Sequence, residues 1–243
     1  MDNNSITCTV TAIKSLTANT SEISLTPKQA VDFFAGQYIT VYLEHKKLPY
    51  SIASSPHQKI IQLLVFHGAN NENIGFFENN LGKTIQISEP MGKAFYRPNN
   101  KVIIAIGKNL GISPIKSIID YLTYIKTHLP SDDKVLLYLY YLGYKQEEFI
   151  LDSYFRNLVN ELHNDSLDID ILYKPVIIED KNNLAEIHNN LLLINNNKLF
   201  SIADFYVYGS NDFVSNIYFR LLPDCHKNFF TDALLDPKYI KIY

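Results

Sequence analysis

Tryptophan is absent from the 243-residue sequence, and cysteine, with two residues, and glycine, with nine, are scarce. Cys8 and Cys225 lie far apart and outside any Cys-x-x-Cys or Cys/His spacing, so the pattern favours neither a metal site nor a disulfide framework. No apolar run reaches the ~20 residues that cross a bilayer, and the N-terminus MDNNSITCTV lacks the pattern of a signal peptide. We therefore expect a cytoplasmic protein that does not enter a membrane and holds no metal ion.

An excess of positive charge is also missing. The formal net charge is −3 at pH 7, whereas a nucleic-acid-binding protein needs Lys and Arg side chains to neutralise phosphates. We therefore expect no nucleic-acid partner. Hydrophobic residues make up 47% of the chain, which is enough for a sizeable core, and the length allows one large domain or two ordinary ones.

The first part of the sequence predicts an antiparallel β-barrel. Its apolar segments are short, rich in β-branched residues and interrupted by Pro, Gly and Asn, as in barrels and sandwiches. The predicted strands are residues 5–13, 22–27, 38–43, 60–68 and 83–90. One short helix is predicted at residues 71–81, NENIGFFENNL, just before Gly82.

The second part of the sequence predicts a parallel sheet. KVIIAIG at 101–107 is a continuous apolar run, typical of a strand buried on both faces, and residues 113–129 follow with apolar residues at helical spacing. Strands and helices then alternate, which is typical of right-handed crossovers with helices on both faces of the sheet. The further predicted strands are residues 134–143, 166–175, 204–210 and 236–243, and the further predicted helices are residues 147–163, 182–194 and 211–222.

The boundary between the two parts is predicted in FYRPNNK, at residues 95–101. It divides the chain into one domain of residues 1–97 and a second of residues 98–243. The predicted fold class is thus a Greek-key antiparallel β-barrel followed by an α/β domain.

Three strand ends in the second part carry glycines and polar residues. They are GKNLGISP at 107–114, YYLGYKQEE at 140–148 and VYGSND at 207–212. Ligands of open parallel sheets bind beyond the carboxyl ends of the strands, where helix N-termini offer free N–H groups. Each segment alone is equally explained as an ordinary turn, so a ligand site is indicated by the three together.

The order of motifs along the whole chain resembles the ferredoxin–NADP reductase superfamily, and within it the small bacterial NAD(P)H:flavin reductases. The segments that carry the resemblance are Ala35-Gly36-Gln37-Tyr38, Pro49-Tyr50-Ser51-Ile52-Ala53-Ser54, Glu89-Pro90-Met91-Gly92, Gly111-Ile112-Ser113-Pro114, Gly143, Tyr208-Gly209 and Asp232-Ala233. The resemblance implies an FAD-binding FR-type barrel that holds a flavin and an α/β domain that binds NADH or NADPH.

The resemblance also implies roles for individual residues. The implied flavin-binding residues are Pro49, Tyr50, Ser51, Ile52, Ala53, Ser54, His67 and Gly68, and Ser51 is the implied catalytic residue, with its hydroxyl near flavin N5. The implied nucleotide-binding residues are Gly107, Lys108, Asn109, Gly111, Ile112, Ser113, Pro114, Gly143, Tyr144, Tyr208, Gly209 and Asp232. For His67, Tyr144 and Asp232 an ordinary structural role is open beside the functional one.

The implied activity is hydride transfer from nicotinamide C4 to flavin N5, with FMN, riboflavin or FAD as an exchangeable substrate. The cofactors perform this chemistry, and the protein mainly aligns them. The partners implied are therefore the small-molecule flavin and the nicotinamide nucleotide.

Several positions depart from the family pattern. Leu48 stands where family members place an arginine that meets the flavin phosphate, a contact worth about 2 kcal/mol, and Lys46 and Lys47 are the nearby cations. Lys108-Asn109 replaces glycines, Tyr144 replaces an arginine, and Tyr208 replaces a cysteine. Two alternatives therefore stay open: a degenerate member that serves as a binding or regulatory subunit, and a reductase component that passes electrons to a protein acceptor.

Overall fold

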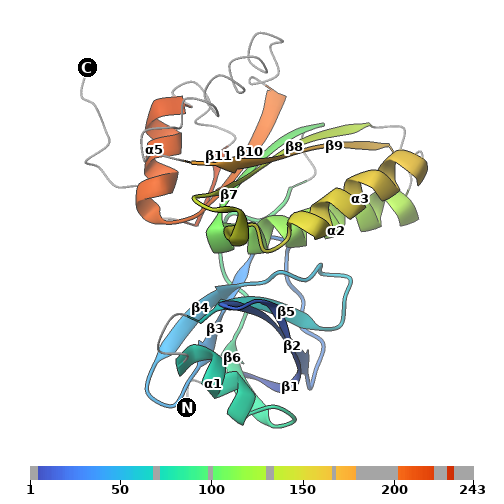
Figure 1. The fold of residues 1–243 in the computed structure, drawn as a ribbon. Coiled ribbons are helices and arrows are strands. Elements are labelled where there is room, and N and C mark those ends of the chain that lie inside the picture. Colours follow the sequence, from blue (N-terminus) through green and yellow to red (C-terminus); the bar gives the residue numbers. More distant parts are fainter. Residues whose placement is uncertain are drawn as a thin grey trace. The chain divides into compact units, whose positions relative to one another are not determined.

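The computed structural model describes residues 5–67, 72–97, 101–129, 134–165, 168–178, 202–221 and 229–232. Its contacts divide the chain into two compact units (Figure 1). Unit 1 comprises Met1–Tyr96 and Ser113–Tyr124, and unit 2 comprises Arg97–Ile112 and Ile125–Tyr243. The predicted helix at 182–194, the predicted strand at 236–243, Gly68 and Cys225 lie outside the described residues.

Unit 1 contains the predicted antiparallel sheet. Its six strands are β1 (Ser5–Thr17), β2 (Thr20–Pro27), β3 (Tyr38–Tyr42), β4 (Lys47–Ser51), β5 (Ile61–Phe66) and β6 (Thr84–Ser88). They lie in the order β4-β3-β6-β1-β2-β5, so β6 returns to lie between β3 and β1, as in a Greek key. An antiparallel bridge from Ile52 to Leu63 joins the end of edge strand β4 to edge strand β5 and closes the sheet toward a barrel.

Alternating apolar side chains build the core of unit 1. In β3, Ile39 and Val41 are buried while their neighbours are only partly covered, which is the period of two that the sequence shows. Helix α1 (Glu72–Asn79), at the predicted place, adds Ile74 and Phe77 to this core. The chain turns after the helix at Gly82, whose φ of 76° is in the left-handed region that glycine tolerates.

Unit 2 contains the predicted parallel sheet. Its strands are β7 (Val102–Lys108), β8 (Val135–Gly143), β9 (Ile169–Ile177), β10 (Ala203–Tyr208) and β11 (Phe229–Phe230), in the order β11-β10-β7-β8-β9. The central strands are buried almost throughout, as their continuous apolar runs predict. The chain goes from β7 to β8 on one side, and β10 pairs with β7 on the other. The β7/β10 pair is thus the point at which the strand order reverses, where open sheets bind ligands.

The helices that follow these strands are α2 (Ile112–His128), α3 (Asp152–Asp165) and α5 (Asn211–Leu221), and short 3-10 turns, η1 (Asn109–Gly111) and η2 (Gln146–Glu148), precede α2 and α3. Although α2 follows β7, its residues Ser113–Tyr124 belong to unit 1, where they contact the segment that follows β4. Among the described residues, no helix combines the length and the apolar composition that crossing a membrane requires.

Candidate functional site

The segment that follows β4 leaves the regular sheet and is buried. Ser51 is the last residue of β4 and pairs with Tyr38, and beyond the Ile52 bridge the Ala53 N–H donates a hydrogen bond to the Gln62 carbonyl at 2.8 Å. Ala53, Ser54 and Ser55 are completely buried. Small side chains are needed here because the chain is enclosed, and the hydroxyls supply hydrogen bonds that the sheet does not provide.

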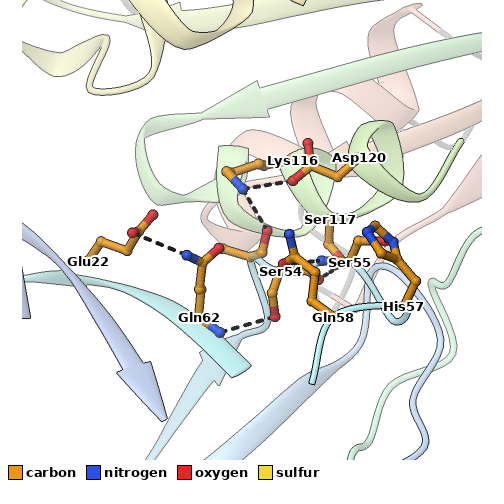
Figure 2. Close-up of polar contacts among 10 residues, drawn as sticks. Glu22, Ser54, Ser55, His57, Gln58, Gln62, Lys116, Ser117 and Asp120 are labelled. Atoms are coloured by element: carbon orange, nitrogen blue, oxygen red, sulfur yellow. Dashed lines mark hydrogen bonds and ion pairs between the residues drawn. The ribbon is translucent and has the colours of Figure 1, made fainter. Parts of the chain in front are cut away.

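Helix α2 lies against this segment and hydrogen-bonds to it (Figure 2). The Ser117 hydroxyl donates to the Ser54 carbonyl at 2.6 Å. The Lys116 ammonium lies 3.4 Å from the Ala53 carbonyl and 2.8 Å from the Asp120 carboxylate. From the other side the Gln62 N–H donates to the Ser54 hydroxyl at 3.1 Å. The segment is therefore held between β5 and α2.

The next residues form a fixed turn. Ser55 Oγ and His57 Nδ1 lie 2.7 Å apart, and the His57 ring stacks on Tyr124 of α2 with ring centroids 3.9 Å apart and planes only 6° from parallel. The Gln58 N–H donates to the Ser55 carbonyl at 3.0 Å. This turn gives the buried segment a second attachment to α2.

Tyr50 carries a buried polar atom that is not satisfied by the protein. Its hydroxyl has no hydrogen-bond partner among the described residues, and its ring meets Phe77 edge-on with centroids 6.0 Å apart. Desolvation raises the pKa of Tyr50 to about 12, so the hydroxyl stays protonated and can donate. A buried donor without a partner is costly unless a ligand accepts its hydrogen bond, so the residue suits a binding site.

The remaining barrel residues of the predicted flavin site lie at strand ends. Ser51 is half-buried, and its hydroxyl makes no hydrogen bond to the described part of the chain. His67 follows β5, its Nε2 lies 3.1 Å from Ser21 Oγ, and its N–H donates to the Asn19 carbonyl. These contacts give His67 a structural role in tying β5 to the β1–β2 turn.

The cations near Leu48 are engaged by the protein. Lys46 forms an ion pair with Glu72 of α1 at 2.7 Å, and the Lys47 ammonium lies 4.6 Å from the centroid of the Tyr42 ring. Both lysines are therefore less available to a flavin phosphate than an arginine at position 48 would be.

In unit 2 the loop after β7 makes a tight turn. Asn109 adopts a φ of 52°, a left-handed conformation that asparagine tolerates better than most residues. Lys108 precedes it, with its ammonium 4.0 Å from the Tyr144 ring centroid and 5.5 Å from that of Phe213. The ammonium also donates to the Tyr144 hydroxyl at 2.5 Å. The ends of β7 and β8 are thus linked by a cation over aromatic rings.

Three of the predicted glycines, Gly111, Gly143 and Gly209, lie in tight packing within unit 2. A Cβ on Gly111 would collide with the backbone carbonyl of Tyr208, and one on Gly209 would lie 2.6 Å from the Phe213 ring. A Cβ on Gly143 would lie 3.1 Å from that of Glu148, whose carboxylate accepts the Tyr144 N–H. Close packing therefore explains these glycines without a ligand, and it brings the ends of β7 and β10 together.

The other predicted nucleotide-binding residues lie at the same ends. Gly107 pairs with Tyr208 in the β7/β10 ladder, and the first residues of α2, which are Ile112, Ser113 and Pro114, are buried. Burial, and then the charge of exposed Asp232, raises the pKa of Tyr208 well above its usual value. The Tyr208 side chain is therefore part of the packed interior of unit 2.

Sequence reasoning missed four residues at these sites, which are Phe213, Lys116, Ser117 and Asp120. A signal for Lys116 and Asp120 was present, because they interrupt an apolar helix pattern at a spacing of four residues. Within the described ranges, no cluster of His, Cys, Asp and Glu could hold a metal ion.

Comparison with solved structures decides the fold. A ferredoxin–NADP+ reductase from Plasmodium falciparum matches with a TM-score of 0.77 over 96% of this chain and 98% of that chain, at 17% sequence identity. The chain has the ferredoxin–NADP+ reductase fold. The predicted fold class, an antiparallel barrel with a parallel α/β sheet, is thereby confirmed.

Relatives of known name share part of this sequence, although no protein-family model matches it. An NAD(P)H-flavin reductase from Aliivibrio fischeri is 34% identical over 148 residues, which are 57% of this chain and 60% of the relative. The ferredoxin–NAD(P)+ reductase component of naphthalene 1,2-dioxygenase/salicylate 5-hydroxylase systems, from a Ralstonia species, is 28% identical over 60% of this chain and 43% of the relative. The chain thus spans about half the length of these relatives. Their names confirm the predicted resemblance to flavin reductases with the ferredoxin–NADP+ reductase fold.

Proposed function

We propose that the protein is an NAD(P)H-dependent flavin reductase, an oxidoreductase that transfers hydride from nicotinamide C4 to flavin N5. The observation that carries this proposal is the 34% identity over 148 residues to an NAD(P)H-flavin reductase. The proposal keeps the predicted division of labour, with the flavin bound by residues 1–97 and the nucleotide by residues 98–243, and it keeps a cytoplasmic location.

The barrel residues would hold and orient the flavin. A bound flavin supplies a ring nitrogen that accepts hydride, a chemistry that no side chain offers. Tyr50 contributes a neutral hydroxyl donor that has no partner among the described residues, and Ser51 contributes a second hydroxyl at the end of β4. Pro49, Ile52, Ala53 and Ser54 complete the segment, which is held in place from both sides.

The residues of unit 2 would bind the nicotinamide nucleotide at the β7/β10 reversal. The first turn of α2 has no side-chain cap on its N-terminal N–H groups, and such groups suit a phosphate. Lys108 adds a positive charge to the same loop, and the Tyr144 ring, which is 38% exposed, offers a stacking surface. Gly111 and Gly209 leave the backbone uncovered by side chains of their own.

The flavin would exchange freely. Leu48 cannot pair with a phosphate, and Lys46 is engaged by Glu72. The phosphate of FMN therefore adds little to affinity, and riboflavin should serve about as well as FMN. A purified preparation should lose its flavin on desalting.

The test is reduction of added flavin under anaerobic conditions. Purified protein is mixed with NADH or NADPH and with FMN, riboflavin or FAD, and the visible absorbance of the oxidised flavin is followed. Loss of absorbance far faster than in a mixture without protein is expected. If no combination of nucleotide and flavin is reduced faster than in that control, the proposal fails, and the degenerate, non-catalytic alternative takes its place.

Ser51→Ala is the first variant to measure. Loss of one oriented hydroxyl at the reacting atom should slow flavin reduction roughly tenfold, since each 1.4 kcal/mol of lost transition-state stabilisation has this effect. Ser51→Thr retains the hydroxyl and is the control. An unchanged rate in a folded Ser51→Ala protein removes Ser51 from the mechanism.

A second candidate function is favoured by the reductase component among the relatives. In this case the protein would pass electrons to another protein. This second function predicts that the flavin stays bound through purification. It also predicts that the protein rapidly reduces an added ferredoxin. An exchangeable flavin would give neither result.

A further inference from the structure

We propose that Ser117 and Lys116 of α2 are positioning residues for flavin reduction, because they fix Ala53 and Ser54, which directly follow the β4 residues Tyr50 and Ser51 and the Ile52 bridge. The inference rests on the proposed function. It assigns a role to two residues outside the motifs that carry the resemblance.

The Ser117 hydroxyl makes the stronger contact. It donates to the Ser54 carbonyl at 2.6 Å, and both residues are completely buried. A short hydrogen bond between groups without access to water leaves no substitute if the donor is removed, so the carbonyl would be left unsatisfied. The position of the Ser54 backbone is therefore tied to α2.

Lys116 and Asp120 extend the same contact. Their side chains are only 8% and 11% exposed, and they pair at 2.8 Å while the ammonium reaches the Ala53 carbonyl at 3.4 Å (Figure 2). Burial of an ion pair brings little stability compared with apolar side chains of similar volume. The pair is better understood as an orienting device, in which Asp120 directs the ammonium toward the backbone of the flavin segment.

The segment needs this support because the sheet no longer holds it. After Ser51 the chain leaves the β3–β4 ladder, and the Ile52 N–H donates to the Gln37 carbonyl at 2.9 Å. Beyond Ile52, the hydrogen bonds that join Ala53 and Ser54 to the sheet in the described part of the chain are those to Gln62 on the side of β5. Ser51 is three residues before Ser54, so movement of the unsupported carbonyls would shift its hydroxyl. A misplacement of about 1 Å at a reacting atom costs a large factor in rate.

The same helix begins at the candidate nucleotide loop. Ser113 and Pro114, in the first turn of α2, precede Ser117 by one helical turn. One continuous helix therefore carries both the candidate phosphate-binding turn and the support of the flavin segment.

The experiment compares Ser117→Ala with wild type in flavin affinity, measured by quenching of riboflavin fluorescence, and in steady-state reduction by NADH or NADPH. We expect the Kd and KM for riboflavin to rise about three- to tenfold, as for loss of one buried hydrogen bond, and kcat to fall. The KM for the nicotinamide nucleotide should stay within about twofold of wild type. Ser117→Thr, which retains the donor, should restore both flavin constants.

Ser88→Ala is the matched control in the same unit. Ser88 is also a buried serine, and its hydroxyl accepts the Thr40 N–H at 2.9 Å and donates to the Glu89 carbonyl at 2.8 Å. Both alanine variants should lower the melting temperature, but only Ser117→Ala should change the flavin constants. If Ser117→Ala is folded and binds and reduces riboflavin like wild type, the inference is wrong.

A second variant covers the case in which Ser117→Ala does not fold. Lys116→Met/Asp120→Leu removes the buried pair together, which avoids an unpaired charge, and it should also raise the Kd for riboflavin. An unchanged Kd in the folded double variant overturns the inference. If wild type itself neither binds nor reduces any flavin, the proposed function fails instead, which distinguishes the two failures.

Discussion

Buried hydroxyl groups differ in whether the protein supplies their hydrogen-bond partners. This difference separates residues with a structural role from residues with a candidate binding role. The Tyr141 hydroxyl donates to the Glu148 carbonyl at 2.9 Å and accepts the Ile150 N–H, whereas the Tyr50 hydroxyl has no partner in the described part of the chain. A buried hydroxyl that the protein leaves unsatisfied reduces stability. The contrast between these two tyrosines yields a direct test.

Tyr50→Phe should leave the free energy of unfolding unchanged or raise it by up to about 1 kcal/mol, because it removes an unsatisfied buried group. The same variant should bind riboflavin about tenfold more weakly if the hydroxyl donates to the flavin. Urea unfolding without flavin and fluorescence titration measure the two effects. Tyr141→Phe is the control and should lower stability by about 1 to 2 kcal/mol. A loss of stability in Tyr50→Phe comparable with that of Tyr141→Phe would contradict this assignment.

At the scale of elements, the sequence predicts most strands, but it does not predict the turn before α3 or the short strand β11. A short β-branched segment predicted β3, and a continuous apolar run predicted β7, because strands buried on one or two faces favour these residues. The helix predicted from residue 147 begins at Asp152, since Glu148 instead caps the turn by accepting the Tyr144 N–H. Strand β11 has only two residues and is defined by its pairing with β10. No local sequence pattern encodes this pairing.

The candidate sites, too, could be predicted from the sequence only in part. The segment from Pro49 to Ser54 could be found because the residues that carry the resemblance follow one another in sequence. The bonds from Ser117 and Lys116 join residues 63 positions apart, so they depend on a tertiary register that a single sequence does not show. The predicted roles of the nucleotide-binding residues stay predictions, since close packing alone explains Gly111, Gly143 and Gly209.

The junction of β7, η1 and β10 can be tested through Gly111. Gly111→Ala places a Cβ against the Tyr208 backbone carbonyl, which cannot move without disturbing the β7/β10 ladder, so we expect the free energy of unfolding to fall by about 1 to 3 kcal/mol. Gly75→Ala in α1 is the matched control: a Cβ there meets nothing within 4 Å, and the variant should gain roughly 0.5 to 1 kcal/mol from helix propensity. Chemical denaturation measures the free energy of unfolding of both variants. Equal changes in Gly111→Ala and Gly75→Ala would refute the close approach at Gly111.

Both units of the molecule contain buried thiol or phenol groups whose pKa values are raised. Desolvation raises the pKa of Cys8 from 9.0 to about 12, and burial raises the pKa values of Tyr50 and Tyr140 from 10.0 to about 12. These groups lose protons in the unfolded chain before they do so in the folded one. Their contribution to stability is therefore complete below about pH 9 and is lost as the pH rises toward 12.

Alkaline solution should accordingly destabilise the protein before the folded state ionises. The free energy of unfolding from urea titrations should decline progressively from about pH 9 upward. Cys8→Ala and Tyr50→Phe should each make this decline shallower, because each removes one proton that only the unfolded state releases. A flat profile to pH 11, or a decline that both variants leave unchanged, would show that these groups do not govern the alkaline limit.

The path of α2 limits how the chain can be dissected. Residues 113–124 belong to unit 1 although they follow the first strand of the parallel sheet, so a fragment cut after residue 97 would lack part of this unit. Ala53 and Ser54 would lose their helical donors. We therefore expect the barrel expressed as residues 1–97 to be less stable than the same barrel in the full chain.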